Sequence, residues 1–274
     1  MYVDVHTHLT HEKFSHDVDL VIARAVSSGL TAIVVNGLSH THNRAVLDLA
    51  KTYPVVKPAL GIYPIDAVHP MLPENYPLPL EKFDVTAEIA FIRSQAEAGL
   101  IAAIGECGLD GHWLDDSTFK EQERVFEELI GIAMDCDIPA IIHTRKLEAR
   151  AMEILKSLGA KKVNFHCFGG RTKLAQWAAE TCGWWFSIPT NATVSESFRK
   201  MLKTLPPEKI LTETDAPYLA PVRGERNEPA NVVGTVRLLA ELRGISQDDA
   251  LNLIHTNYVT LFGQKWAAGH QKIL

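Results

Sequence analysis

Hydrophobic and polar positions along this chain follow two recurring patterns. Thr31–Asn36 (TAIVVN) is mostly apolar and β-branched, which predicts a strand buried on both faces. In Thr118–Asp137 the apolar residues instead recur every three or four positions, which predicts a long amphipathic helix. Glycines end several of the helical segments, as Gly159 does after Leu158. Short strands and helices are therefore expected to alternate along the chain.

Eight segments have the strand pattern, and helical segments separate them. The predicted strands are Val3–Val5, Thr31–Asn36, Val55–Ile62, Ile101–Gly105, Ala140–Ile142, Lys162–Phe165, Trp184–Ile188 and Ile210–Thr212. The predicted helices are Asp17–Ser28, His42–Tyr53, Val85–Ala98, Thr118–Asp137, Ala149–Leu158, Thr172–Thr181, Ser195–Thr204, Asn231–Leu242 and Gln247–Leu261. This order in 274 residues predicts an α/β fold, the (β/α)8 TIM barrel. An open doubly wound sheet is the main alternative, but no glycine-rich phosphate loop follows the first strand.

The stretch Ile65–Asp84 breaks the alternation. It holds four prolines and has no clear periodicity, so it is predicted to be a long loop, and loops of this length in a compact domain are often functional. No internal repeat or low-complexity tract divides the chain. We therefore expect a single domain over residues 1–264 and a frayed C-terminal tail over residues 265–274.

The charge balance limits the classes of partner. The chain has 27 Lys and Arg against 33 Asp and Glu, a net charge of −6, so a nucleic acid would have to bind to a local basic patch. The N-terminus lacks a signal-like apolar run, and no apolar stretch approaches the roughly 18 residues of a membrane span. The four cysteines are scattered and form no CxxC pair. These features predict a cytoplasmic protein with reduced thiols and no membrane partner.

The stretch Lys209–Ala220 (KILTETDAPYLA) changes abruptly from apolar to acidic and then reaches a proline. Its pattern predicts a buried strand that delivers carboxylates, among them Asp215, at its C-terminal end. Other predicted strands also stop at a histidine or a carboxylate. Because the C-terminal ends of the strands of a TIM barrel meet at one face, these side chains are expected to converge. The strand-end set is His6, His8, Glu106, His143, His166 and Asp215.

A set of this composition suits metal binding. Each member alone is more simply explained as a polar strand end, an ion-pair partner or a satisfied core histidine, but burying all of them without a metal would be costly. Imidazoles and carboxylates are ligands of divalent first-row metals, and the set exceeds what one tetrahedral zinc needs. We therefore expect two divalent ions about 3.5–4 Å apart, as in two-metal hydrolases. Glu106, on a middle strand, is placed to bridge them.

The strand ends belong to longer motifs. These are VDVHTHL, IGECGLD, FKEQ at Phe119–Gln122, PAIIHTR, HCFGG, TNAT, LTETDAPYL and GERNEPA. In this combination the chain resembles the TatD-type metal-dependent hydrolases, a branch of the amidohydrolase superfamily. The resemblance covers nearly the whole chain. It implies phosphodiester hydrolysis, often of DNA, with divalent metals such as Mg²⁺, Mn²⁺ or Zn²⁺.

The resemblance also implies roles for individual residues. Asp215 would accept the proton of the attacking water, so that Asp215 and Glu106 are the candidate catalytic residues. Arg145, two residues beyond a ligand, would contact a substrate phosphate. The implied ligands are His6, His8 and Asp215 on one ion, His143 and His166 on the other, and Glu106 bridging the two.

Two positions depart from the family pattern. Gly111 follows GLD, where the family usually has an aromatic residue, and Tyr63 lies in GIYP, where the family often has GxHP. Both positions are expected near the entrance for the substrate. They leave the metal ligands unchanged and bear on the choice of substrate, as does the long loop Ile65–Asp84.

Several arginines follow predicted strands and are candidates for a cationic rim. Arg171 and Arg223 are equally well explained as solvated surface residues. The candidate substrate-binding residues are Arg145, Arg226 and Tyr218.

The sequence therefore predicts a two-metal-dependent hydrolase of phosphodiester bonds, with single-stranded or frayed DNA as its substrate. An amidohydrolase activity on a small ester or amide would use the same chemistry and is the first alternative. A metal-stabilised binding or quality-control factor with little turnover is the second, although a binding protein has no need for so many ligands. The metal, the cleavage direction and the oligomeric state stay open, and a monomer is compatible with the sequence.

Overall fold

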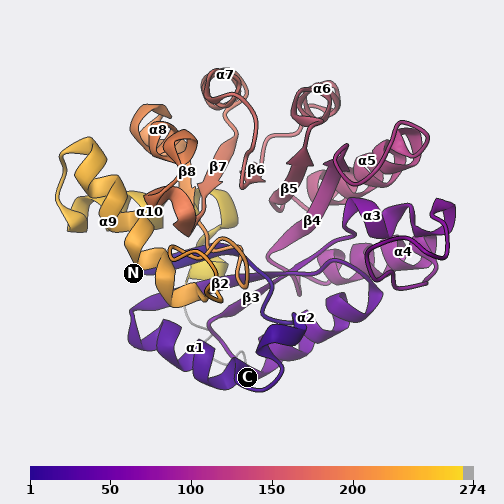
Figure 1. Ribbon diagram of the computed structural model, residues 1–274, viewed down its shortest axis with the longest axis horizontal. Helices are drawn as coiled ribbons and strands as arrows, with labels where there is room; N and C mark the ends of the chain where they lie inside the picture. Colours follow the sequence, from indigo (N-terminus) through magenta and orange to yellow (C-terminus); the bar gives the residue numbers. More distant parts are fainter. Residues whose placement is uncertain (268–274) are drawn as a thin grey trace.

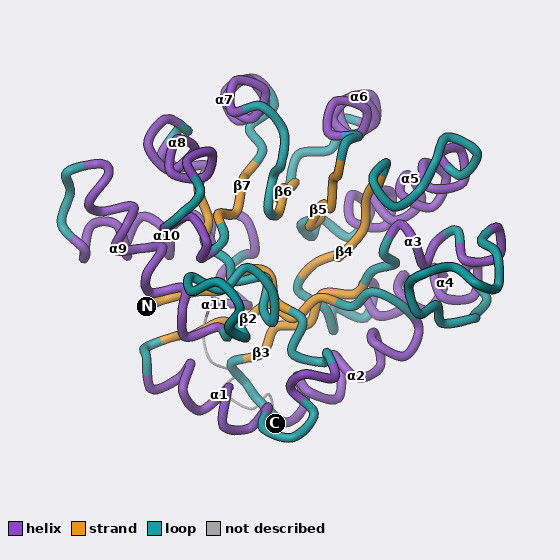
Figure 2. The backbone as a smooth tube through the Cα atoms, in the orientation of Figure 1, coloured by secondary structure: helices purple, strands orange, loops and turns teal. Residues whose placement is uncertain are grey.

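The computed structural model describes residues 1–267, which form one eight-stranded parallel sheet ringed by helices (Figures 1 and 2). The strands are β1 (Tyr2–Thr7), β2 (Leu30–Asn36), β3 (Val56–Leu60), β4 (Ala103–Asp110), β5 (Ala140–Arg145), β6 (Val163–His166), β7 (Trp185–Ile188) and β8 (Ile210–Thr212). Strands that are consecutive in the chain are neighbours in the sheet, and each pair is parallel. This arrangement confirms the predicted TIM barrel.

The first and last strands meet and close the barrel. The N–H of Asp215 donates a hydrogen bond to the carbonyl of His6 at 2.9 Å, and the N–H of His8 donates one to the carbonyl of Ala216 at 2.8 Å. Deeper in the barrel, the hydroxyl of Thr212 donates to the carbonyl of Val3 at 3.1 Å. The junction between the two ends of the sheet therefore lies at the face where the predicted ligands are.

Within residues 1–267, nine longer helices cover the outside of the barrel (Figure 1). They are α1 (Val18–Ser27), α2 (His40–Thr52), α4 (Val85–Glu97), α5 (Phe119–Asp135), α6 (Glu148–Leu158), α7 (Thr172–Thr181), α8 (Glu196–Thr204), α9 (Val232–Arg243) and α10 (Gln247–Phe262). Side chains of Asp84, Ser195 and Ser246 cap the N-termini of α4, α8 and α10, as expected for short polar residues there. Within residues 1–267, no helix has the length and apolar character needed to cross a membrane.

The fourth strand differs from its prediction. It was expected to end at Gly105, but β4 continues to Asp110. Its backbone keeps pairing with β5, with Gly108 opposite His143 and Asp110 opposite Arg145. The polar and glycine positions after Gly105 interrupt the apolar pattern, whereas the backbone pairing, which does not depend on that pattern, continues.

The predicted loop Ile65–Asp84 is only partly irregular. A short helix, α3 (Pro64–Ala67), and a single 3-10 turn over His69–Met71 occupy its start. Near its end, the Glu81 carboxylate accepts hydrogen bonds from the side chain of Ser39 and from the backbone of Thr41. These bonds attach the segment to the start of α2.

The chain after α10 also differs from its prediction. Lys265–Ala267, the start of the expected frayed tail, lies in the short helix α11 (Gln264–Ala267), where the Trp266 side chain is buried. The rest of that predicted tail, residues 268–274, lies outside the described residues.

Gly108 lies where the backbones of β4 and β5 come closest. Its φ is +151°, and a Cβ there would stand 1.9 Å from the carbonyl oxygen of His143. We expect Gly108→Ala to lower the free energy of unfolding by more than about 2 kcal/mol, because the clash is with backbone and no side-chain rotation relieves it. Urea denaturation of the metal-free protein measures this change.

Gly131, inside α5, is the matched control, because nothing lies within 4 Å of a Cβ placed there. We expect Gly131→Ala to raise the free energy of unfolding by about 0.5–1 kcal/mol, the usual gain in a helix. Equal urea midpoints of unfolding for the Gly108→Ala variant and the wild type would contradict the close approach of β4 and β5.

Candidate metal centre

The six side chains predicted at strand ends converge at the C-terminal face of the barrel. They come from five strands on different sides of the ring, and none has a side chain more than 14% exposed. Their positions are His6 in β1, His8 one residue past it, Glu106 in β4, His143 in β5, His166 at the end of β6 and Asp215 three residues past β8.

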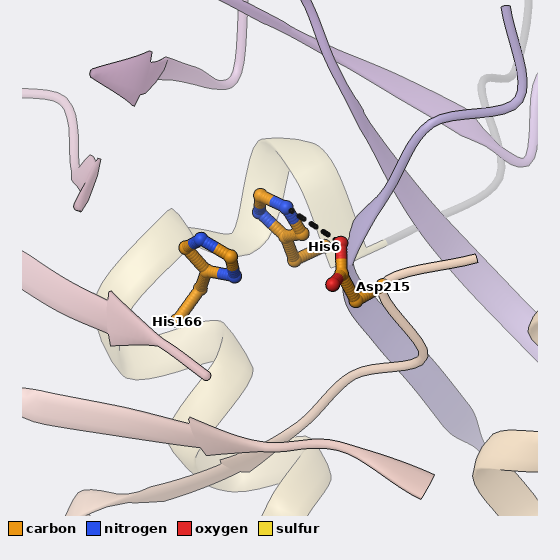
Figure 3. A group of neighbouring side chains, drawn as sticks. All are labelled: His6, His166 and Asp215. Carbon is orange, nitrogen blue, oxygen red and sulfur yellow. Dashed lines mark ion pairs between the residues drawn. The ribbon is translucent and has the colours of Figure 1, made fainter. Parts of the chain in front are cut away.

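Four of these side chains direct one donor atom each toward a common point. The Nε2 atoms of His6 and His8 are 3.1 Å apart. Glu106 Oε2 lies 3.4 Å and 3.3 Å from these two nitrogens, and Asp215 Oδ1 lies 3.5 Å and 3.3 Å from them. Figure 3 shows the His6 ring between His166 and Asp215, with its ion pair to Asp215.

A second set of donors lies beside the first. Glu106 Oε1 is 3.0 Å from both His143 Nδ1 and His166 Nε2, and these two nitrogens are 3.4 Å apart. The His166 ring also stacks on the His6 ring, with centroids 3.8 Å apart and planes inclined by 10° (Figure 3). The two sets are therefore in direct contact, and Glu106 gives one oxygen to each.

Both sets have the dimensions of a metal site. Donors about 3.3 Å apart at the corners of a tetrahedron lie about 2.0 Å from its centre, which is the usual length of bonds from zinc to imidazole nitrogen and carboxylate oxygen. In the first set His6, His8 and Glu106 supply three such donors, with Asp215 beside the two histidines, and Glu106, His143 and His166 supply three in the second. Imidazole and carboxylate donors accept several divalent metals, so the arrangement fits a divalent ion in each set.

The two carboxylates of the site are held ionised. Burial alone would raise the pKa of Glu106, but the adjacent His166 and hydrogen bonds from His143, His166 and His6 hold it well below its usual range. Burial likewise opposes ionisation of Asp215, yet hydrogen bonds from His6 and His8 lower its pKa. Both groups are therefore negatively charged at neutral pH, as metal ligands must be.

The imidazoles respond to the same charges. Burial disfavours the protonated form of His143, but Asp110 and Glu106 outweigh this effect and raise its pKa to about 9. Hydrogen bonds to Asp215 and Glu106 also raise the pKa of His6 and His8 against their burial. Burial, followed by the neighbouring His6, lowers the pKa of His166 to about 4. Without metal, the cluster therefore keeps protons that a divalent ion would displace.

Asp110, at the end of β4, orients the ligand His143. Its Oδ2 lies 3.1 Å from His143 Nε2, which leaves Nδ1 of the same ring facing Glu106. Gln122 on α5 fixes Asp110 in turn, because its side chain accepts a hydrogen bond from the Asp110 N–H and donates one to the Asp110 carbonyl. Neither residue is assigned a role by the sequence pattern, although GLD and FKEQ contain them.

Two further buried carboxylates, Asp4 and Glu213, hold the backbone beside the donor residues through hydrogen bonds. Asp4 accepts hydrogen bonds from the backbone of His6 and from the backbone and hydroxyl of Thr214, which joins the ligand strand β1 to the segment that bears Asp215. Glu213 accepts the N–H of Cys167, directly after His166, at 2.8 Å. Burial raises the pKa of Asp4 to about 7 and that of Glu213 well above its usual range. The sequence signal for both residues is an acidic residue close to an apolar strand, Asp4 in VDVHTHL and Glu213 in LTETDAPYL.

The backbone of Asp215 is unusual. Its φ is +54°, in the left-handed region that few residues other than glycine adopt. Hydrogen bonds on both sides hold it there, from its own N–H to His6 and from the N–H of Tyr218 to its carbonyl. The conformation costs energy that these bonds offset, and it turns the carboxylate toward the histidines.

The three predicted substrate-binding residues have different surroundings. Arg145 is exposed at the end of β5. Tyr218 is 47% exposed, and its ring lies edge-on to that of the ligand His8 with centroids 6.5 Å apart. Arg226 donates two hydrogen bonds to the Asp17 carboxylate, at 2.7 Å and 2.6 Å, and is thereby held at the start of α1.

Tyr63, the departure in GIYP, lies against a metal ligand. Its ring contacts that of His143 with centroids 4.8 Å apart, and its hydroxyl is 3.4 Å from His143 Nε2. Burial and the nearby carboxylates raise the pKa of this hydroxyl, so it stays protonated. Asn43 fixes the turn that bears it by donating to the carbonyl of Gly61 and accepting from its N–H. An uncharged phenol thus borders the second donor set.

Comparison with protein families gives a match over nearly the whole chain. The family model described as TatD related DNase matches residues 3–263. The chain is 31% identical over 268 residues to the uncharacterized metal-dependent hydrolase YabD of Bacillus subtilis (strain 168), covering 96% of this chain and 99% of that protein. It is 32% identical over 275 residues to the 3'-5' ssDNA/RNA exonuclease TatD of Shigella flexneri serotype 5b (strain 8401), covering 95% and 98%.

A solved structure has the same overall form. The crystal structure of YJJV, a TatD homologue from Escherichia coli K12, superposes with a TM-score of 0.82 at 26% identity. The match covers 95% of this chain and 97% of that one.

The raised pKa of His143 predicts how metal binding depends on pH. Below its pKa of about 9 this ring is protonated in the metal-free protein, and a divalent ion must release that proton to bind. We therefore expect the affinity for Mn²⁺ to rise about tenfold or more per pH unit from pH 7 to 9 and to level off above it. Titration calorimetry of the metal-free protein at each pH measures this dependence.

His143→Asn is the control for that experiment. It removes the titrating group, so its remaining affinity should change less steeply with pH than that of the wild type. An affinity of the wild type that stays constant between pH 7 and 9 would contradict the proton displacement.

Proposed function

Because this chain belongs to the TatD related DNase family and is a metal-dependent hydrolase, we propose that it cleaves phosphodiester bonds with two divalent ions. The observation that carries the proposal is the shared carboxylate. Glu106 gives Oε2 to a set with His6 and His8 and Oε1 to a set with His143 and His166. Two adjacent divalent ions are the arrangement that phosphodiesterases use to stabilise the attacking and leaving oxygens.

We propose single-stranded or frayed DNA as the substrate class. The name of the Shigella relative, an ssDNA/RNA exonuclease, supports this choice over a small ester or amide. The bound ions, Mg²⁺, Mn²⁺ or Zn²⁺, would polarise the phosphoryl group and make a nearby water more acidic. The remaining steps depend on side chains of the chain itself.

Asp215 is proposed to take the proton of the attacking water. Its side chain is 14% exposed, against 3% for Glu106, so it is the ligand carboxylate that water reaches more easily. Its lowered pKa keeps it ionised and able to accept a proton. Only one of its oxygens faces His6 and His8, which leaves the other for the water.

The substrate is proposed to bind across the face of the barrel. Arg145 would pair with a phosphate near the second donor set, because it follows His143 by two residues and is exposed. Tyr218 would contact the nucleic-acid strand on the side of the first donor set. Lys13 Nζ lies 5.7 Å from the centre of the Tyr218 ring. Arg226 is the weaker candidate of the three, because its guanidinium already donates to Asp17 and to the carbonyl of Lys13.

The proposed function is tested with the purified protein stripped of metal. We expect no cleavage of a single-stranded oligonucleotide until Mg²⁺ or Mn²⁺ is added, and slower cleavage of the same sequence as a blunt duplex, because bound strands must be free of base pairing. Gel analysis of end-labelled substrates measures both rates. Full activity of a verified metal-free preparation would contradict the metal dependence, and inactivity on every phosphodiester offered with metal bound would contradict the proposed reaction.

Asp215→Asn separates metal binding from proton transfer. Asn is nearly isosteric and still offers an oxygen to a metal, but it cannot accept the proton, and loss of a general base costs roughly 10²–10⁴-fold in rate. We expect the variant to keep the fold and at least one metal while turnover falls across the whole pH range. The measurement is turnover against pH with metal content determined on the same samples.

Arg145→Ala serves as the comparison for that variant. It should weaken substrate binding at low salt and leave metal content unchanged, because Arg145 is no ligand. Near-normal turnover of Asp215→Asn with its metals bound would exclude Asp215 as the base.

A further inference from the structure

An exposed tryptophan lies beside the metal centre, on the turn that follows β4. Trp113 is 42% exposed, although large aromatic side chains gain much by burial. The guanidinium carbon of Arg145 lies 5.9 Å from the centre of its ring, and His112 packs edge-on against it with centroids 5.0 Å apart. One face of the turn thus combines an exposed aromatic surface with a nearby cation.

The backbone under Trp113 is fixed from both sides. The N–H groups of His112 and Trp113 both donate to Asp110 Oδ1 at 2.7 Å. The carbonyl of Trp113 accepts a hydrogen bond from the hydroxyl of Tyr76 at 2.8 Å, which ties the turn to the long segment before α4. The indole is therefore presented in a defined position, which lowers the entropy that a ligand stacked on it must overcome.

The same carboxylate connects this turn to the metal ligands. While Asp110 Oδ1 accepts the two N–H groups, Oδ2 orients the imidazole of His143. Asp110 is also paired in register with Arg145 across β4 and β5. Trp113 is thus positioned by the residue that positions His143, and the guanidinium of Arg145, two residues past His143, lies near the indole.

Gly111 lies in the same turn, between Asp110 and Trp113, where there is little space for a side chain. A Cβ at this position would stand 3.0 Å from Leu147 Cγ, so a larger side chain directly after GLD would press on the start of α6. The aromatic residue of the turn comes two positions later, as Trp113.

We propose that Trp113 and Arg145 form a subsite for one nucleobase of a single-stranded nucleic acid, next to the phosphodiester bond being cleaved. The proposal rests on the proposed function, because Arg145 holds a phosphate there while the neighbouring base stacks on the indole. Stacking on an aromatic side chain accepts every base, since each has a π face. The subsite would therefore provide affinity with little sequence preference, and it would favour single strands, whose bases are free to leave the helix stack.

The chain offers a matched control for this proposal. Trp177, on the outer helix α7, is 38% exposed and also has a cation near its ring, Lys156 Nζ at 5.2 Å. It is similar to Trp113 in exposure and in its neighbouring charge. It differs in that no hydrogen bond connects its turn of helix to a ligand of the metal centre among the described residues.

The test compares Trp113→Ala, Trp113→Phe and Trp177→Ala in the metal-loaded protein. We expect Trp113→Ala to raise the KM for a single-stranded oligonucleotide about 5- to 150-fold, the equivalent of the 1–3 kcal/mol that one stacked base contributes, with kcat little changed. Trp113→Phe should recover much of this loss. Trp177→Ala should match the wild type, and metal content should be the same in all four proteins.

An abasic substrate makes the assignment specific. The wild type should lose affinity for an oligonucleotide that lacks the base beside the cleaved bond, and Trp113→Ala should lose nothing further on that substrate. Binding of a phosphorothioate-linked oligonucleotide, which resists hydrolysis, gives the same comparison without turnover. Equal affinities of the wild type and Trp113→Ala for normal and abasic strands would overturn the subsite.

The binding measurement also separates this proposal from the proposed reaction. A wild type that binds the resistant strand through Trp113 but cleaves no phosphodiester would retain the subsite and refute the reaction. A wild type that cleaves the normal strand, with Trp113→Ala indistinguishable from Trp177→Ala, would refute the subsite and retain the reaction. Failure of the wild type to bind any single strand would refute the subsite as well.

Discussion

The structure depends on holding one ionised carboxylate, that of Glu106, which is itself buried, among four imidazoles. Three glycines make that position possible, because Cβ atoms there would meet the surrounding chain: at Gly61 the carbonyl of Glu106, at Gly105 Ile141 Cβ, and at Gly108 the carbonyl of His143. The strands therefore approach each other more closely around Glu106 than ordinary side chains allow. Close packing of backbone excludes solvent, and a low local dielectric strengthens every interaction of the carboxylate.

Around this centre, carboxylates outside the two donor sets hold the residues within them. Asp4 holds the backbone on either side of the barrel junction, Asp110 fixes the tautomer of His143, and Glu213 holds the chain just past His166. Partners of this kind set the orientation and basicity of ligands in metal sites generally. The positions of the donor side chains are therefore fixed by the buried carboxylates Asp4, Asp110 and Glu213 as well as by contacts among the donors themselves.

The convergence of these six side chains could be predicted from the sequence, because an apolar run that stops at a polar residue is a local pattern, and a barrel brings all such stops to one face. The extension of β4 to Asp110 could not be predicted from the sequence, because it depends on the register of β4 with β5. The roles of Asp110 and Gln122 depend on partners 33 and 12 residues away along the chain. The pairing of Arg226 with Asp17 spans 209 residues, which no local pattern encodes.

The junction of β1 with β8 has a consequence for how the protein matures. Asp4 and Thr214, which join there, are 210 residues apart in the chain, and the first donor set needs His6 and Asp215 from the same two segments. During synthesis the N-terminal ligands leave the ribosome long before Asp215 does. Until then His6, His8 and Glu106, and the donors of the second set once β6 is made, are present without Asp215. All six donors can therefore come together only in a finished ring, so a metal bound with the help of Asp215 would report a completely folded chain.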